Sequence, residues 1–406
     1  MRNLDACQEM LISCDRLVDG DGAVIGSADT VLVRDGLIVS VGQRASLEGE
    51  VKGDAKKLHF PGCTLMPGLV NAHDHMLFRR STLPMATLFA RSQSYQSFFG
   101  ARNAALALMD GVTSSRDMAA IGYLSGELRD AVACGMIPGP TIVSCQRAIT
   151  RPGGPGSALS IPVENDDQAL AAVEQLVESR ADFIKVFAST DGSSASQPVL
   201  DEHTIALIVK RASQHGLKTV AHATTRDSIK ACINSGVFCV EHGPELDNVL
   251  AREMAANGMW FTPTMSGFWV IGVEGEKWGR PPHVISAFAA CLKPHVAAVR
   301  AAVEEGVSLA VGTDSLGTMH MEIDLLSQAG VPISDIIRAA TSGGAELLGL
   351  QSTGRLQNRY RADLLVLRGN PLEDISAFLR PELVVLRGRE VETSVLSRQY
   401  CQFEEK

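Results

Sequence analysis

The chain has 406 residues, of which 45% are hydrophobic and 20% are charged. This composition is ordinary for a globular protein, and it excludes disorder, collagen-like repeats and coiled coil as descriptions of the whole chain. The 37 basic and 46 acidic side chains give a formal net charge of −9. Nucleic-acid binders usually carry a basic surface, so we expect no nucleic-acid partner.

Cysteine usage and the apolar runs bear on the compartment. The nine cysteines are scattered and never form a CxxC motif, a pattern typical of reduced thiols rather than disulfides. Residues 1–5 lack the apolar run of a signal peptide. No uninterrupted apolar run reaches the roughly 18 residues that a membrane span needs, so we expect no membrane contact. We predict a cytoplasmic location.

Both ends of the chain predict β-structure. Residues 31–42 contain two apolar runs around Asp35-Gly36, which is a hairpin signal. Near the other end, residues 362–367 and 383–388 also have strand-like composition. We therefore predict one small β-sandwich domain built from residues 1–66 and 351–406.

The middle of the chain, residues 67–350, alternates between apolar strands and amphipathic helices such as 167–180 and 202–215. The predicted strands are residues 68–75, 111–117, 141–146, 182–188, 218–223, 236–242, 259–264 and 307–314. Eight buried strands alternating with helices predict an α/β fold, a (β/α)₈ TIM-like barrel. The longer interval between the last two strands contains Trp269, Trp278 and a Gly/Pro-rich stretch, and we interpret it as a loop and helix able to cover the barrel mouth.

Several of these strands end in side chains that bind metals. His73 and His75 are two residues apart on one strand, so both should face the barrel axis. His222, His242 and Asp314 each end another predicted strand. A lone strand-end histidine is commonly a hydrogen-bonded core residue, but four histidines and an aspartate at strand ends favour a metal site.

Lys185 lies inside the apolar run Phe-Ile-Lys-Val-Phe. Burial disfavours the charged ammonium and lowers the lysine pKa. A neutral amine can react with carbon dioxide to form a carbamate, which could bridge two metal ions. The alternative is that Lys185 pairs with a nearby carboxylate.

These stretches resemble the amidohydrolase superfamily, and the resemblance runs along nearly the whole chain. It rests on Met66-Pro67-Gly68-Leu69-Val70-Asn71-Ala72-His73-Asp74-His75, Gly111-Val112-Thr113, Phe183-Ile184-Lys185, Ala221-His222-Ala223, Glu241-His242-Gly243, Gly312-Thr313-Asp314 and Ala362-Asp363-Leu364-Leu365-Val366. The chain looks most similar to the imidazolonepropionase-related, prolidase-like branch. That branch contains Xaa-Pro dipeptidases, arginine carboxypeptidases, ochratoxin-type amidases and phenylurea hydrolases.

The resemblance implies a binuclear hydrolase of C–N bonds in small amide-type substrates. His73, His75 and Asp314 would bind one divalent metal ion, His222 and His242 would bind a second, and carboxylated Lys185 would bridge the two. Zinc is the expected ion for a site of imidazoles and carboxylates, and manganese or cobalt could substitute. A hydroxide held between the ions would attack the substrate carbonyl, and Asp314 would act as general base and then as general acid.

The substrate is less defined by the resemblance. Peptidase-like members carry a Gly-Gly-His-Gly loop after strand three, where this chain has proline in place of the histidine at residues 153–156, and they often carry a tyrosine after strand seven, which is absent here. The apolar residues Met265, Phe268 and Trp269 would suit an aryl amide, carbamate or urea as well as a dipeptide or N-acyl amino acid. The alternative is that these three residues only pack the barrel rim.

Three further predictions concern polar residues near the expected site. Arg151 could bind a substrate carboxylate, and His320 could orient the carbonyl, although a solvated arginine and a helix-capping histidine are alternatives. We interpret Arg116 and Asp117 as a structural ion pair. The helices around the barrel are compatible with a homo-oligomer.

Two other functions compete with amide hydrolysis. The first is a mononuclear deaminase of an aminated heterocycle. Deaminases of this superfamily show His-x-x-Glu after strand five and lack the lysine on strand four, whereas this chain has Thr225 at the glutamate position and keeps Lys185. The second is a non-catalytic binding relative, which would be expected to lose metal ligands. The complete set of ligands favours the hydrolase.

Overall fold

The computed structural model describes residues 9–52, 54–83, 85–190 and 199–400. The chain divides into two compact units. Within the described residues, the first covers 9–70, 105–114 and 332–400, and the second covers 71–104 and 115–331.

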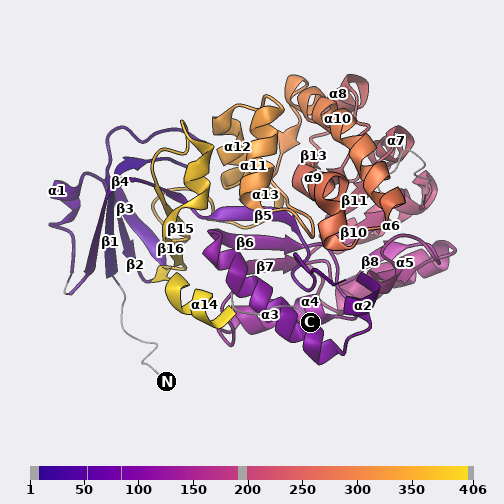
Figure 1. Cartoon of the computed structure of the whole chain (residues 1–406), viewed down its shortest axis with the longest axis horizontal. Coiled ribbons are helices and arrows are strands. Elements are labelled where there is room, and N and C mark those ends of the chain that lie inside the picture. The colour runs from indigo at the N-terminus through magenta and orange to yellow at the C-terminus, as the bar shows by residue number, and fades with distance from the viewer. Residues whose placement is uncertain (1–8, 53, 84, 191–198, 401–406) are drawn as a thin grey trace. The chain divides into compact units, whose positions relative to one another are not determined.

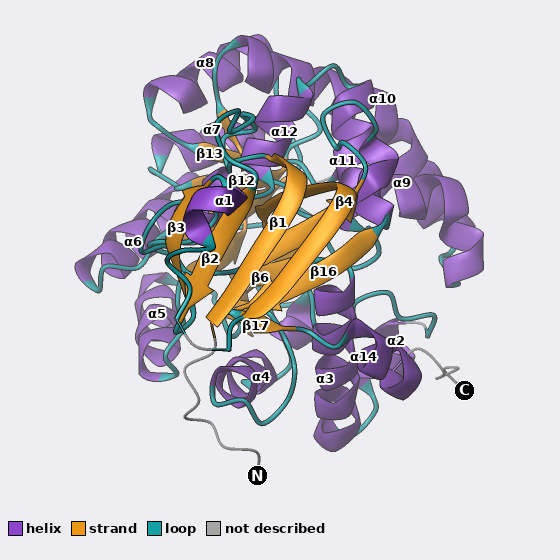
Figure 2. Cartoon of the chain, turned by 90° about the vertical axis from the view of Figure 1, so that its left-hand side faces the viewer, coloured by secondary structure: helices purple, strands orange, loops and turns teal. Residues whose placement is uncertain are grey.

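The first unit is built around one seven-stranded sheet that combines both ends of the chain (Figure 1). In sheet order its strands are β17 (Arg389–Glu390), β16 (Pro381–Leu386), β15 (Leu364–Arg368), β4 (Lys56–Pro67), β1 (Glu9–Leu17), β2 (Thr30–Arg34) and β3 (Leu37–Gly42). Strands β1 and β4 pair in parallel, and the other neighbours pair antiparallel. Figure 2 shows β1–β4 and β16 as strands of this sheet, in which β15 separates β16 from β4.

The sequence predicts the main features of this sheet. The expected hairpin is present as β2 and β3, and its turn residues Asp35 and Gly36 have φ angles of 52° and 81°. Glycine adopts such positive φ angles without steric cost. One hydrophobic core, which includes Ile12, Leu65 and Val366, takes side chains from both ends of the chain. The helices of this unit are α1 (Arg44–Leu47), α12 (Ile333–Ala339), α13 (Ser342–Leu347), the 3₁₀ helix η3 (Ile375–Leu379) and α14 (Thr393–Tyr400).

The second unit is an α/β structure with a parallel sheet of seven strands. The sheet order is β14 (Ser308–Leu309), β13 (Trp260–Thr262), β12 (Cys239–His242), β11 (Thr219–Ala223), β10 (Ile184–Phe187), β8 (Ala148–Thr150) and β9 (Ser160–Pro162). All neighbouring pairs in this sheet are parallel. A separate three-stranded sheet consists of β5 (Leu69–Asp74), β6 (Val112–Asp117) and β7 (Thr141–Ser144). The first two residues of β5 and the first three of β6 belong to the first unit.

Backbone hydrogen bonds join the three-stranded sheet to the parallel strands on both sides. The Ala72 N–H donates to the Val311 carbonyl at 2.8 Å, beyond β14. On the other side, the Asp182 N–H donates to the Ser144 carbonyl at 2.8 Å, just before β10. All eight stretches predicted as strands contain an observed strand, whereas β8 and β9 were not predicted.

Helices alternate with these strands, and Figure 1 shows α6–α10 alongside β10–β13. They are α2 (Met85–Phe89), α3 (Gln93–Met109), which continues into the first unit, α4 (Leu124–Ala133), the 3₁₀ helix η1 (Ser157–Leu159), α5 (Asp166–Glu178), α6 (Glu202–Gln214), α7 (Arg226–Asn234), α8 (Asn248–Ala256), α9 (Met265–Glu274), the 3₁₀ helix η2 (Gly275–Trp278), α10 (Pro282–Glu304) and α11 (Met319–Gln328). Side-chain caps start several of them, since Asn165, Asp201 and Asp247 accept backbone N–H bonds at the first turns of α5, α6 and α8.

Two expectations about compartment can be compared with the described residues. Helix α10 is, by length and composition alone, long and apolar enough to cross a membrane, which is weak evidence because core helices of soluble proteins pass the same test. It packs against α9 and α8. The seven cysteines within the described ranges are free, as expected. Cys7, Cys401 and residues 1–5 lie outside those ranges.

Candidate metal centre

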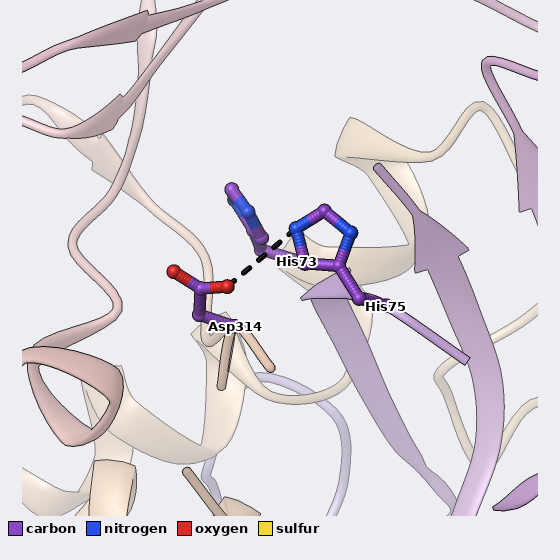
Figure 3. Close-up of side chains that lie close together, drawn as sticks. All are labelled: His73, His75 and Asp314. Carbon is purple, nitrogen blue, oxygen red and sulfur yellow. Dashed lines mark ion pairs between the residues drawn. The ribbon is translucent and has the colours of Figure 1, made fainter. Parts of the chain in front are cut away.

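Three of the predicted ligands meet in the second unit (Figure 3). The nitrogen and oxygen ligand atoms of His73, His75 and Asp314 all lie within 4.8 Å of one another. Among the described residues, they form the one group of three or more His, Cys, Asp or Glu side chains with metal-site spacing. The two histidines and the aspartate are far apart in the sequence. The parallel bridge between Asp74 and Asp314 brings the two segments together.

A buried chain of hydrogen bonds that runs through Glu241 to Arg116 orients the His73 imidazole. His73 lies on β5 and is 1% exposed, and its Nδ1 is 2.7 Å from Glu241 Oε2. The other carboxylate oxygen of Glu241 accepts a hydrogen bond from Arg116 Nη2 at 2.7 Å. Since a carboxylate only accepts hydrogen bonds, His73 Nδ1 carries the proton and its Nε2 keeps a free lone pair. Burial lowers the pKa of His73 well below its usual value, so the ring is neutral.

His75 follows β5 directly and is oriented in the same way. Its Nδ1 donates to the Ala119 carbonyl at 3.4 Å, and its Nε2 lies 3.5 Å from Asp314 Oδ1. The ring stacks on Phe78 at 4.5 Å between centroids. Burial lowers the pKa of His75. The neutral ring therefore presents its Nε2 lone pair to the place where Asp314 lies.

Asp314 is positioned by its backbone. Its N–H donates to the His73 carbonyl at 2.9 Å, and its φ angle is 55°, in the left-handed region that non-glycine residues rarely adopt. Such backbone strain costs on the order of 1 kcal/mol or more and is typical of functional sites. A Cβ at Gly267 would lie 2.9 Å from Asp314 Cβ, so the approach of α9 to Asp314 requires glycine there.

His222 and His242 lie beside this group on adjacent strands, β11 and β12. Their ring centroids are 4.5 Å apart, and the His242 ring is 4.8 Å from that of His73. His222 Nε2 donates to the Thr190 carbonyl at 2.9 Å, which leaves its Nδ1 lone pair free. Burial lowers the pKa of His222 to about 3 and that of His242 well below its usual value. Both rings are neutral and able to bind a metal ion.

Lys185 is the exceptional side chain of the centre. It lies on β10, is 2% exposed, and its Nζ has no hydrogen-bond partner among the described residues. Its nearest ring contact is with Phe187, at 5.9 Å from the centroid. Burial lowers its pKa, and the neighbouring Arg116 charge acts in the same direction. A buried ammonium without an acceptor is costly, and within the described residues Lys185 forms no ion pair with a carboxylate.

One cavity of about 370 Å³ contains the whole set. All six residues predicted as metal ligands line it, together with Phe78, Met85, Phe89, Met118, Pro155, Gly156, Leu159, Phe187, Phe268, Ile271, Arg280, Val284, Phe288 and Ser315. Apart from the ligands, its wall is mainly aromatic and aliphatic. The segment after β13 does contribute to the wall, through α9, the residue Arg280 and α10.

Some predicted residues lie elsewhere. Arg151 is exposed and lines a separate cavity of about 340 Å³. His320 is half-buried in the first turn of α11 and is not among the residues that line the 370 Å³ cavity. Of the three apolar residues after strand seven, Phe268 lines the cavity, and Met265 and Trp269 do not.

The sequence analysis also assigned one pair incorrectly. Arg116 does not pair with Asp117, because its guanidinium binds Glu241 and the Ala72 carbonyl. Asp117 instead accepts a hydrogen bond from the Met76 N–H at 2.9 Å. The adjacent Arg116 and Asp117 are on a strand, so their side chains point to opposite faces. That alternation was the signal that could have excluded the pair.

Comparison with known proteins decides the family. A sequence model described as the Amidohydrolase family matches residues 64–391. The chain belongs to this family. The resemblance stated from the sequence motifs is confirmed.

Proteins that are similar to this chain include hydrolases. The ochratoxinase of Aspergillus niger is 26% identical over an alignment of 427 positions, which covers 94% of this chain and 85% of the relative. Its crystal structure superposes with a TM-score of 0.84 at 25% identity, covering 95% of this chain and 96% of the other. A Xaa-Pro dipeptidase with bound methionine has a TM-score of 0.83 at 23% identity and shares the fold over 95% of this chain and 100% of its own. Family membership and these relatives indicate an enzyme of the hydrolase class.

The carboxylate behind His73 yields a prediction. Replacing Glu241 by Gln should lower the metal affinity of the centre about 10- to 100-fold, because one of the two oxygens that accept from His73 and Arg116 becomes an NH₂ group that cannot accept. Competition of the protein with a chromophoric chelator for Zn²⁺ measures this. Glu253→Gln is a matched control, since Glu253 pairs with Lys230 and is 37% exposed. Unchanged affinity in a folded Glu241→Gln protein would contradict the role given to Glu241.

Proposed function

We propose that this protein is a binuclear metal-dependent hydrolase that cleaves a C–N bond of a small amide-type substrate. The substrate classes are those expected from the sequence: a dipeptide, N-acyl amino acid, aryl amide, carbamate or urea. The observation that carries the proposal is that all six predicted ligand residues line a single cavity. Four of them are neutral imidazoles, buried in the case of His73 and His242 and half-buried in the case of His75 and His222. Three of the four have one nitrogen lone pair left free by a defined hydrogen bond.

The donor set fits two ions only if Lys185 is modified. His73, His75 and Asp314 supply three donors for the first ion. His222 and His242 supply two for the second, one short of the three protein ligands typical of a catalytic zinc site. Carboxylation of Lys185 would provide the missing oxygen donors and could serve both ions. The preferred ion for imidazole and carboxylate donors is Zn²⁺.

The environment of Lys185 suits this modification. The unprotonated amine attacks carbon dioxide, a new N–C bond forms, and one proton is released, so that the product is an anionic carbamate. Burial favours the unprotonated amine that this reaction requires. The unpartnered Nζ would become part of an anion next to two cations, which removes the cost of the buried ammonium.

The reaction then depends on Asp314. Two divalent ions, when bound, supply Lewis-acid polarisation of the substrate carbonyl and lower the pKa of a water molecule so that it can attack as hydroxide. The Asp314 carboxylate accepts the proton of the attacking water and delivers it to the leaving nitrogen. Glu241 holds the His73 imidazole in place during this transfer, and the Ala119 carbonyl holds that of His75.

The fold and the domain organisation follow the family in this proposal. The eight strands β5, β6, β7 and β10–β14, joined by the bonds of Ala72 and Asp182, would form the closed (β/α)₈ barrel. The seven-stranded sheet of the first unit, with one core shared by both chain ends, would be the small β-sandwich. The domain limits remain those predicted, 1–66 with 351–406 and 67–350. A cytoplasmic location and a homo-oligomer also remain predictions.

A mononuclear deaminase is the competing function. The three-donor group of His73, His75 and Asp314 alone would suit a single ion. Against it stands Lys185, whose buried and unpartnered amine lies in the same cavity and has no role in a deaminase.

The first prediction concerns catalysis. The zinc-loaded protein should hydrolyse members of a panel of dipeptides, N-acyl amino acids, anilides, N-aryl ureas and carbamates. Asp314→Asn should lower kcat at saturating Zn²⁺ at least about 100-fold, because the proton acceptor is lost. Asp324→Asn, at a half-buried residue of α11 that accepts a hydrogen bond from Gln328, is the control. Ammonia release from a heterocycle without amide hydrolysis would contradict the proposal and favour the deaminase.

The second prediction concerns Lys185. Protein prepared with carbon-13 bicarbonate and zinc should show a carbamate resonance in its NMR spectrum. Lys185→Ala should abolish this resonance and reduce zinc from about two ions to about one per chain, because the second site loses its third ligand. Lys218→Ala is a matched control, because Lys218 also faces an aromatic ring, Phe238 at 5.0 Å, but is exposed. Two zinc ions in Lys185→Ala would contradict the bridging role.

A further inference from the structure

Arg280 is a second cation in the wall of the cavity. It follows η2 and precedes α10, in the segment between the last two strands of the parallel sheet. The side chain is half-buried and lines the cavity together with the six predicted metal ligands. Among the described residues, Arg280 and Lys185 are the only lysine or arginine side chains that line it. Lys185 has a role in the proposed metal binding, whereas Arg280 has none.

The described residues leave the guanidinium of Arg280 incompletely matched. Its Nε is buried without a hydrogen bond, and the described residues offer it no ion pair. A buried guanidinium is normally matched, as Arg116 is by the Glu241 carboxylate. An unmatched one loses its hydration without compensation. Burial removes water from the charged guanidinium of Arg280, and this desolvation lowers its pKa.

The nearby carboxylates are engaged elsewhere. Glu274 pairs with Lys277 at 3.0 Å, and Glu276 is exposed. Among the described residues, the one acidic side chain that lines the cavity is Asp314, which attracts Arg280 through space without a hydrogen bond to it. Asp314 is also needed for metal binding and proton transfer. The positive charge of Arg280 is therefore left for a ligand.

The backbone holds Arg280 in place before any ligand arrives. The Arg280 N–H donates to the Gly275 carbonyl at 2.9 Å, and Gly279 reaches the turn with a φ angle of 63°. A Cβ at Gly275 would lie 2.7 Å from the Ile285 side chain, so the tight packing of η2 on α10 requires glycine there. Fixing the arginine in advance reduces the entropy cost of binding an anion.

We propose that Arg280 binds a carboxylate of the substrate. A guanidinium can bind a carboxylate through two parallel hydrogen bonds. Arg280 is the one arginine among the described residues that line the cavity. The cavity wall also includes the apolar side chains of Ile271, Val284 and Phe288. The substrate class is then an amide that carries a free carboxylate and an apolar group, such as an N-acyl amino acid. Neutral ureas and carbamates would leave Arg280 unsatisfied. The proposal rests on the proposed amide hydrolysis and narrows its substrate.

Hydrolysis of a matched pair of substrates tests the proposal. N-acetylphenylalanine carries the carboxylate, and N-acetylphenethylamine lacks only that group. The zinc-loaded protein should prefer the first. Arg280→Gln should reduce kcat/KM for N-acetylphenylalanine roughly 10- to 100-fold, mainly through KM, because a charge-assisted hydrogen bond is lost. Activity on N-acetylphenethylamine should not change. Arg280→Lys should retain part of the preference, because it keeps the charge and loses the two-pronged geometry.

The control variant is Lys277→Gln, at a 73% exposed cation of the same segment. It should not alter activity on either substrate. Equal losses on both substrates in Arg280→Gln, or no loss on either, would overturn the carboxylate-binding role. If Arg280→Gln leaves the preference for N-acetylphenylalanine intact, amide hydrolysis stands and the assignment of Arg280 fails.

A binding experiment separates this proposal from the proposed function. Calorimetry would compare hydrocinnamate with hydrocinnamyl alcohol, two ligands that the enzyme cannot hydrolyse. Tighter binding of hydrocinnamate that Arg280→Gln weakens about tenfold or more supports Arg280, even if no amide is turned over. Binding of hydrocinnamate that is insensitive to Arg280→Gln would overturn the assignment, because the anion would then be held elsewhere.

Discussion

Burial of nitrogen donors at the ends of parallel strands is the constraint on which this centre depends. An exposed histidine is partly protonated near neutral pH, and a protonated ring cannot bind a metal ion. Here burial lowers the pKa of the four histidines, and acceptors such as Glu241 and the Ala119 carbonyl fix which nitrogen is free. The strand ends therefore present lone pairs rather than charges. The same burial lowers the pKa of the unpartnered Lys185 amine.

The described buried polar groups of the second unit are of two kinds, those with partners and those without. Arg116 is buried and fully matched by Glu241 and a backbone carbonyl, so it stabilises the framework of the centre. Lys185 and Arg280 are buried at nitrogen atoms that have no partner in the described chain. Each of these two groups lines the cavity. Their unmet polar atoms mark where a modification or a ligand would complete the structure, since unsatisfied buried groups are rare.

Much of the centre could be predicted from the sequence, because parallel strands bring their carboxyl ends to one edge of a sheet. His73 and His75 were assigned from their spacing of two, and His222 and His242 from their places at strand ends. The hairpin at Asp35 and Gly36 was predictable from local turn chemistry alone. In each case a local pattern, either alternation or a turn signal, determined the position.

Other features depend on contacts that no local pattern specifies. The pairing of Arg116 with Glu241 joins residues 125 positions apart, and the sequence favoured the adjacent Asp117 instead. Arg151 and His320 belong to loops and helix ends, whose placement the sequence leaves open, and neither lines the cavity. Arg280 was missed for the same reason. It enters the cavity through the arrangement of η2 and α10, where packing rather than periodicity sets the direction of the side chain.

The most direct test of the central claim is a crystal structure of the zinc-loaded protein with anomalous diffraction measured on both sides of the zinc absorption edge. We expect two zinc peaks in the cavity, one bound by His73, His75 and Asp314 and the other by His222 and His242, with density for a carbamate on Lys185 between them. A single peak at the first site with an unmodified Lys185 amine would contradict the binuclear hydrolase.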